Sequence, residues 1–191
     1  MKILGINGSS RPEGNTTQLL EMVIEAIKEE LPDVETEIIQ LASKKVEPCL
    51  ARGNCFKKKD NKCIQDDDVN EIFAKMLDAD AIILGSPTYF ADVSGRMKNL
   101  IDRIGYLGIA NGHALKHKLG AAVVAVRRQG ACRAFNSINM VFLINQMFVV
   151  GSSYWNLGIG KHEGDVQEDK EGQDTMKNLG KNFAWLLKKI G

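Results

Sequence analysis

The sequence lacks an apolar stretch long enough to cross a bilayer. Its most apolar run, residues 140–150, is interrupted by Asn145 and Gln146, whereas a spanning helix needs about 20 apolar residues. The first residues enter an apolar run directly at Ile3, without the layout of a secretory signal peptide. We therefore expect a cytoplasmic protein that does not bind membranes.

An excess of charge of either sign is also missing. The 191 residues carry 25 Lys and Arg against 24 Asp and Glu. Nucleic-acid-binding domains show a basic face and electrostatically docking electron carriers are usually acidic, so neither class is favoured. Cysteine is scarce too, since four residues in a chain this long do not make a disulfide framework. The length and 44% hydrophobic content suit one domain over residues 1–191.

What the sequence does contain is a polar loop between a short apolar strand and a helix. Residues 2–6 form the expected strand, and apolar residues at helical spacing begin at Leu19. The first amides of a helix are unpaired and partly positive, so they bind phosphate readily. The loop adds hydroxyl, amide and guanidinium donors from Ser9, Ser10, Arg11, Asn15, Thr16 and Thr17.

An ordinary turn is the alternative, with Asn15 as the helix N-cap and Gln18 completing a variant of the capping box. That alternative leaves the hydroxyl groups unexplained, so phosphate binding is favoured. The loop matches neither the P-loop of NTPases nor the glycine-rich fingerprint of dinucleotide-binding folds. A monophosphate ester such as FMN is therefore the ligand that we expect.

Strands and helices alternate along the whole chain. Strands are expected at residues 2–6, 35–41, 81–84, 119–126 and 148–152, and helices at about 16–31, 69–77, 94–104, 133–146 and 175–190. The alternation predicts an α/β fold, a doubly wound five-stranded parallel sheet of flavodoxin-like order 2-1-3-4-5. Its ligand would lie at the carboxyl ends of the strands, between the first and the third. An irregular stretch at 42–65 is long enough to suggest a function.

The segment after the third expected strand agrees with that geometry. Pro87 stiffens a turn, and Thr88, Tyr89 and Phe90 offer backbone amides and an aromatic wall to a flat ring. Alone, the segment is equally well explained as a proline turn with aromatic packing; at the expected ligand edge, flavin binding is favoured. The residues after the fourth expected strand, Arg127, Gln129 and Gly130, reach the same edge of the sheet. They either contact the pyrimidine part of the flavin or form a solvated turn.

Together these motifs resemble the NADPH-dependent FMN reductase and iron–sulfur flavoprotein group of the flavodoxin-like superfamily. The resemblance rests on residues 8–11 with 14–16, on 86–89, and on 97–98 with 101–103. It implies FMN held by the two loops, NADPH or NADH as reductant, and a homodimer or homotetramer. Because the flavin supplies the redox chemistry in such proteins, no catalytic side chain is expected.

One segment departs from that group. Members with a cluster carry a run of four cysteines beginning Cys-x-x-Cys-x-x-Cys; here Arg52 takes the second position between Cys49 and Cys55, and Cys63 follows. A [4Fe–4S] cluster normally needs four thiolates, so we expect no cluster and no metal site. The cysteines then serve as packing residues or as redox-reactive thiols, and packing is favoured.

The expected function is that of an FMN-dependent NAD(P)H oxidoreductase whose acceptor is a small molecule, such as a quinone or a flavin, or a protein. Two alternatives stay open: an iron–sulfur flavoprotein that relays electrons, and a non-enzymatic flavodoxin-type carrier. The preferred nucleotide and the physiological acceptor are left open as well. Apolar residues Met140, Phe142 and Met147 are expected to provide surface for the homo-oligomer.

Overall fold

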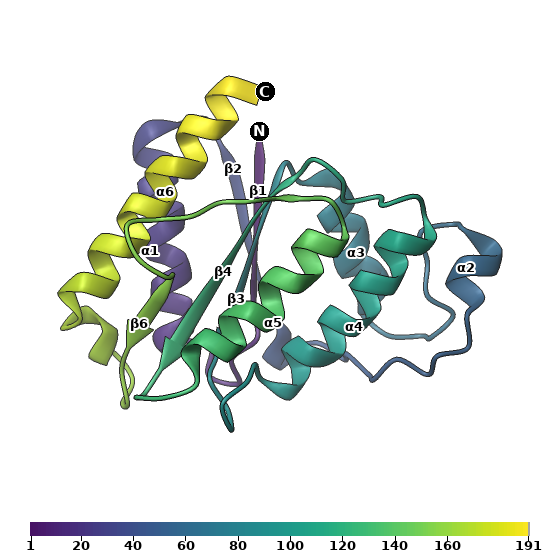
Figure 1. The fold of residues 1–191 in the computed structure, drawn as a ribbon, viewed down its shortest axis with the longest axis horizontal. Helices are drawn as coiled ribbons and strands as arrows, with labels where there is room; N and C mark the ends of the chain where they lie inside the picture. Colours follow the sequence, from purple (N-terminus) through teal and green to yellow (C-terminus); the bar gives the residue numbers. More distant parts are fainter. Residues whose placement is uncertain (191) are drawn as a thin grey trace.

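The structure, a computed structural model, describes residues 1–190. Figure 1 shows a central sheet with helices on both sides. The elements are, in chain order, β1 (Lys2–Asn7), α1 (Asn15–Glu30), β2 (Glu35–Gln40), the 3-10 helix η1 (Leu41–Ser43), α2 (Asn54–Lys58), α3 (Val69–Asp78), β3 (Ala81–Pro87), α4 (Gly95–Ala110), β4 (Leu119–Val126), α5 (Ala131–Ile144), β5 (Phe148–Val149), β6 (Leu157–Ile159), the 3-10 helix η2 (Asp165–Gln167) and α6 (Lys170–Ile190).

The sheet is parallel and its strands lie in the order β2-β1-β3-β4-β5, as predicted. Strand β1 lies between β2 and β3, so that Ile3 pairs with Thr36 on one side and Ala81 on the other. Every residue of β4 is buried, as expected of a strand covered on both faces. The order reverses between β1 and β3, which is where such sheets bind ligands.

The fifth strand differs from the prediction of one strand over 148–152. Strand β5 has two residues and pairs with the start of β4, at Leu119 and Gly120. The end of β4 pairs instead with a sixth strand, β6. The residues between them, 150–156, include Gly151, Ser152 and Ser153, which favour turns over strands. The edge strand is therefore interrupted, and its second half was missed because three residues give too short a pattern.

Two layers of helices cover the sheet. In Figure 1, α1 and α6 lie together on one face, and α3, α4 and α5 lie on the other. Leu19, Leu20, Val23 and Ile27 of α1 are fully buried, which is the apolar stripe of a surface helix. Among residues 1–190, no helix combines the length and apolar composition needed to cross a membrane.

Two helix bounds differ from the prediction. Helix α4 ends at Ala110 and not at about residue 104, and α6 begins at Lys170 and not at about residue 175. Glycine disfavours helix in isolation, but Gly105 and Gly108 lie against α5, where a Cβ on Gly108 would come within 1.8 Å of the Asn145 side chain. Close helix packing therefore overrides the propensity. The first turn of α6 is polar, so it showed no apolar periodicity.

The predicted apolar surface is also partly wrong. Met140 is exposed, but Phe142 and Met147 belong to the core on the α3–α5 side of the sheet. Phe142 points inward because it covers β4 at Gly120, where it comes within 3.0 Å of a Cβ built on that glycine.

Candidate functional site

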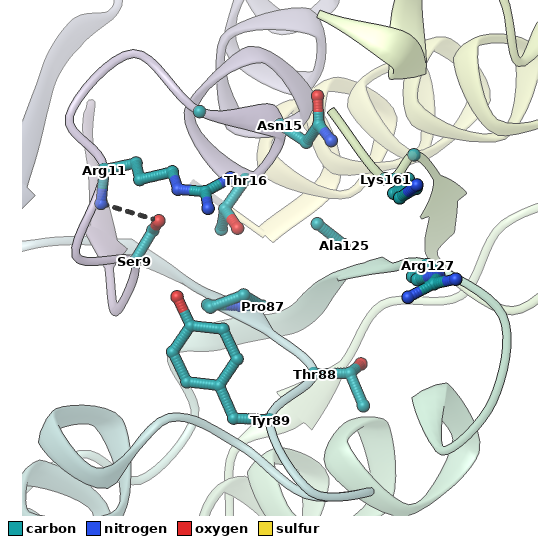
Figure 2. A pocket seen from close by; sticks show the side chains of 12 residues that line it. Ser9, Arg11, Asn15, Thr16, Pro87, Thr88, Tyr89, Ala125, Arg127 and Lys161 are labelled. Atoms are coloured by element: carbon teal, nitrogen blue, oxygen red, sulfur yellow. Dashed lines mark hydrogen bonds between the residues drawn. The ribbon is translucent and has the colours of Figure 1, made fainter. Parts of the chain in front are cut away.

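A pocket of about 180 Å³ opens at the carboxyl edge of the sheet, where the sequence placed the ligand. Figure 2 shows side chains from the β1–α1 loop on one side and from the ends of β3, β4 and β6 on the others. The lining residues are Ser9, Arg11, Gly14, Asn15, Thr16, Pro87, Thr88, Tyr89, Ala125, Arg127, Gly160 and Lys161. Ten of these residues lie in or beside the β1–α1, β3–α4 and β4–α5 connections, and the other two come from the loop after β6.

The end of the pocket at which the sequence predicts phosphate binding is built by the loop before α1. Ser9 and Thr16 are both buried, and the Ser9 hydroxyl accepts the backbone N–H of Arg11 at 3.0 Å. Helix α1 begins directly at the pocket, with Gly14 as N-cap and no side-chain cap bond, so its first amides have no acceptor within the helix. Hydroxyls and unpaired amides therefore converge at one place, as an anion requires.

Two predicted phosphate residues lie outside the pocket lining. Thr17 Oγ1 donates to the Pro12 carbonyl and accepts from Asn7 Nδ2, which folds the loop back on itself. The exposed Ser10 hydroxyl accepts from Arg96 Nη1 of α4 at 3.2 Å. Both side chains shape the loop rather than line the pocket.

Asn15 lines the pocket, but its side chain is engaged with another loop. Its Nδ2 donates to the carbonyl of His162 at 2.8 Å, and its Oδ1 accepts the backbone N–H of Gly164 at 2.9 Å. The alternative in which Asn15 caps α1 is therefore wrong. A Cβ on Gly160 would approach Asn15 Nδ2 to 2.6 Å, so the close contact requires glycine.

The loop that Asn15 anchors adds a cation that sequence reasoning missed. Lys161 lies two residues after the end of β6, and it lies beside Arg127 in Figure 2. The backbone amides of His162 and Lys161 donate to Asp165 and lower the pKa of that carboxyl. No sequence motif marks Lys161, because its neighbourhood depends on a contact between residues that are far apart in the chain.

The pocket is strongly positive. Arg11, Arg127 and Lys161 are lining residues, and the lining contains no Asp or Glu. Within residues 1–190, none of these three cations forms an ion pair with a carboxylate. An anionic ligand is the natural complement of such a site.

The opposite wall is formed by the loop after β3. Thr88 donates its backbone N–H to Ala125 at 2.8 Å, while its hydroxyl is buried and has no hydrogen-bond partner among the described residues. Tyr89 lines the pocket and is half exposed, and Phe90 is fully exposed beyond it. A buried hydroxyl without a partner beside a pocket indicates a polar ligand atom.

Gly130 supports this wall without lining the pocket. Its φ is +90° and a Cβ there would lie 2.5 Å from the Ala91 Cα, so only glycine lets the two loops meet. Gln129 is exposed and likewise lies outside the lining. Of the residues predicted after β4, Arg127 alone is a lining residue.

Comparison with known proteins identifies the family. The model of the NADPH-dependent FMN reductase family matches residues 1–162. The chain belongs to this family. An iron–sulfur flavoprotein of Methanocaldococcus jannaschii is 45% identical over 197 residues, covering 100% of this chain and 99% of that protein. One of Methanosarcina thermophila is 34% identical over 192 residues, covering 100% and 97%.

Solved structures share the fold. A flavone reductase matches with a TM-score of 0.73 at 21% identity, over 100% of this chain and 64% of that one. A flavodoxin, a WrbA-like protein from Agrobacterium tumefaciens, matches with a TM-score of 0.67 at 13% identity, over 100% of this chain and 98% of that one. The flavodoxin-like fold is thereby confirmed, and family membership confirms FMN as cofactor and a nicotinamide nucleotide as its reductant. The individual site residues stay predictions.

The donor set fits FMN. Ser9, Thr16 and the first amides of α1 suit a phosphate, Arg11 supplies charge, and the unpartnered Thr88 hydroxyl suits a polar atom further along the ligand. A hydroxyl-rich cradle without a carboxylate is what a phosphate monoester requires.

The cysteine loop does not fit a four-thiolate cluster. Cys49, Cys55 and Cys63 line one hollow of about 40 Å³, about the volume of one or two water molecules. Cys132 is exposed on α5, away from that hollow. Within residues 1–190, no three His, Cys, Asp or Glu side chains converge in a metal-binding arrangement. The loop thus presents three thiols, one fewer than a [4Fe–4S] cluster normally takes.

Proposed function

We propose that the protein is an FMN-dependent oxidoreductase that takes electrons from NADPH or NADH and passes them to a small acceptor such as a quinone or a flavin. The observation that carries the proposal is the pocket at the sheet's switch point, with an anion cradle at the start of α1 and a partly exposed aromatic wall at Tyr89. Family membership supports it independently.

In this proposal each part of the pocket has a binding role. Ser9, Thr16 and the amides of α1 hold the FMN phosphate, and Arg11 and Lys161 balance its charge. Arg127 lies at the end of β4, where it would face the polar part of the flavin. When bound, FMN supplies the redox chemistry by accepting hydride and releasing electrons singly or in pairs.

The chain itself would bind and orient FMN and leave part of it accessible to the nicotinamide nucleotide. The pocket volume of about 180 Å³ is below the roughly 300–1,000 Å³ typical of small-molecule sites, so it encloses only part of FMN. The aromatic rim, with Tyr89 partly and Phe90 fully exposed, leaves the rest of the ligand reachable by a nicotinamide. The lining offers no Asp, Glu or His, which agrees with a reaction that needs no side-chain acid or base.

We further propose that the protein is a homodimer or homotetramer. Tyr106 of α4 and Met140 and Ile144 of α5 are exposed, and they line a groove of about 420 Å³ between the two helices. An apolar groove of this kind commonly marks a protein interface. The partly open pocket gives a second reason, because a neighbouring subunit would cover the part of the flavin ring that the pocket leaves exposed.

The test uses the purified full chain and its absorption spectrum. The oxidised flavin band should bleach anaerobically on adding NADPH or NADH and return when a small quinone is added. Absence of bleaching with both nucleotides would refute the reductase and leave the flavodoxin-type carrier. An iron–sulfur absorbance beneath the flavin bands would favour the alternative of an iron–sulfur flavoprotein, which is the name that the two relatives described above carry.

A further inference from the structure

The β1–α1 loop and the β3–α4 segment, which form facing sides of the pocket, are tied together at Gly8. The backbone N–H of Gly8 donates to the Gly85 carbonyl at 2.8 Å, and the Gly8 carbonyl accepts the Ser94 hydroxyl at 2.7 Å. A Cβ on Gly8 would come within 2.9 Å of the Met97 Cβ and 3.0 Å of the Ser94 Oγ. The first loop therefore rests directly on the end of β3 and the start of α4, an approach that glycine permits.

Ser94 carries this contact on to the opposite wall of the pocket. It is 3% exposed and is not a lining residue. Its hydroxyl also accepts the backbone N–H of Met97 at 3.2 Å, which caps α4, and its own backbone N–H donates to Ser86 Oγ at 3.0 Å. The Ser86 hydroxyl in turn donates to the Pro87 carbonyl at 2.8 Å. A chain of hydrogen bonds thus runs from Gly8 to a lining residue of the opposite wall.

Each side of the pocket also has its own internal support. In the first loop, the buried Asn7 side chain accepts the backbone N–H of Ser9 at 2.8 Å. In the opposite wall, which faces Thr16 in Figure 2, Thr88 donates its backbone N–H to Ala125 of β4. Neither bond involves Ser94. Loss of the Ser94 hydroxyl would therefore leave both sides formed and change how one is placed relative to the other.

We propose that Ser94 is a positioning residue that sets the separation between the phosphate cradle and the wall for the flavin ring. The inference rests on the proposed function, in which FMN contacts both sides of the pocket at once. A ligand that joins two subsites gains affinity only when the two are held at a matching distance. Without the Ser94 hydroxyl the first loop can shift relative to α4, and a ligand that spans both sides loses part of that gain.

The test compares ligands that fill one subsite with a ligand that fills both. Fluorescence titration of the full apoprotein measures FMN and riboflavin, which has the same ring without the phosphate, and calorimetric titration measures inorganic phosphate. Ser94→Ala should weaken FMN binding about tenfold, because a misplacement of about 1 Å can cost up to about 100-fold. The affinities for riboflavin and for inorganic phosphate should change by no more than about twofold. Ser94→Thr keeps the hydroxyl and should restore most of the FMN affinity.

Ser152 provides the matched control. Its hydroxyl likewise donates to a backbone carbonyl, that of Thr175 at 2.6 Å, and accepts a nitrogen, Asn178 Nδ2 at 3.2 Å. It lies between β5 and β6, outside the pocket lining. Ser152→Ala should lower the melting temperature, as Ser94→Ala does through loss of its helix cap, but should leave the ratio of FMN affinity to riboflavin affinity unchanged.

Gly8→Ala disturbs the same contact from the other side and gives the decisive measurement if Ser94→Ala does not fold. An unchanged ratio of FMN to riboflavin affinity, or an equal loss for all three ligands, would overturn the role of Ser94. The bleaching of bound flavin by NADPH or NADH is measured separately, so a failure of this proposal leaves the proposed oxidoreductase intact. Equal binding of FMN and riboflavin by the unmodified chain would overturn the phosphate cradle together with this proposal.

Discussion

Placing a negative charge in the phosphate cradle should abolish FMN binding without unfolding the protein. Thr16 is buried at the pocket end of α1, where an aspartate would confront the ligand phosphate. A carboxylate in the first turn of a helix is stabilised by about 0.3–1 kcal/mol by the helix dipole, which offsets part of the cost of placing a charge at this buried position. Thermal melting of the apoprotein separates loss of binding from loss of folding.

The size of the effect follows from Coulomb's law. Two unit charges about 4 Å apart repel by about 4 kcal/mol at an effective dielectric constant near 20. At about 1.4 kcal/mol per factor of ten, this raises the dissociation constant of FMN roughly 1,000-fold. Arg11 and Lys161 line the same pocket and screen part of the repulsion, so we expect between about 100-fold and 1,000-fold.

The matched control is Ser10→Asp, which adds the same charge to the neighbouring exposed position where Arg96 can pair with it. Its FMN affinity should change by no more than about threefold, because exposed charges are screened. Fluorescence titration of the apoprotein with FMN gives both constants, and thermal melting of each apoprotein shows that it is folded. Unchanged affinity in Thr16→Asp, or equal loss in both variants, would refute the assignment of the cradle.

Three further outcomes are expected. Gly130→Ala should weaken FMN binding about tenfold by displacing Ala91, whereas Gly112→Ala, which also has a positive φ but open space, should leave binding unchanged in the same titration. Burial alone would raise the pKa of Asp67, but hydrogen bonds from Arg103 and from the backbone lower it below the value in the unfolded chain. The ionised carboxylate therefore stabilises the fold at pH values above the unfolded pKa of about 3.9. This stabilisation is lost as the pH falls through the lower pKa of the folded state. Asp67→Asn should cost about 3–5 kcal/mol at pH 7 and flatten that acid dependence in urea unfolding, and an unchanged profile would contradict this. Sedimentation at micromolar concentration should show a dimer or tetramer; a lone particle of 21.1 kDa would exclude both.

The sheet and most of the lining were predictable from sequence because local patterns encode them. The run at 119–126 is wholly apolar and became β4 with the predicted bounds. Pro87, Thr88 and Tyr89 were placed at the ligand edge by strand order alone, and they do line the pocket. Connectivity rules for parallel sheets supply this much without any knowledge of contacts.

The remainder depended on contacts between distant segments. Arg103 lies in the mixed-charge first half of α4, a composition typical of a solvated helix face. In the structure its Nη1 donates to the Glu47 carbonyl of the 42–65 loop and pairs with Asp67, and both side chains are only 1% exposed. Lys161 lines the pocket from a loop that Asn15 and Asp165 hold in place. Neither event leaves a periodic signal, since each depends on two segments that meet only after folding.

Asn15 shows why residue type at a motif position does not determine its role. An amide at the start of α1 suits a phosphate ligand or a helix cap equally well in sequence. In the structure both of its polar atoms bind the loop after β6, which is the loop that exists because the fifth strand is interrupted and resumes as β6. The proposed cradle therefore combines two segments that lie far apart in the chain: α1 gives the amides, and the anchored loop gives Lys161. In the proposed site, charge balance at the phosphate would depend on the broken edge strand as much as on the hydroxyl-rich motif.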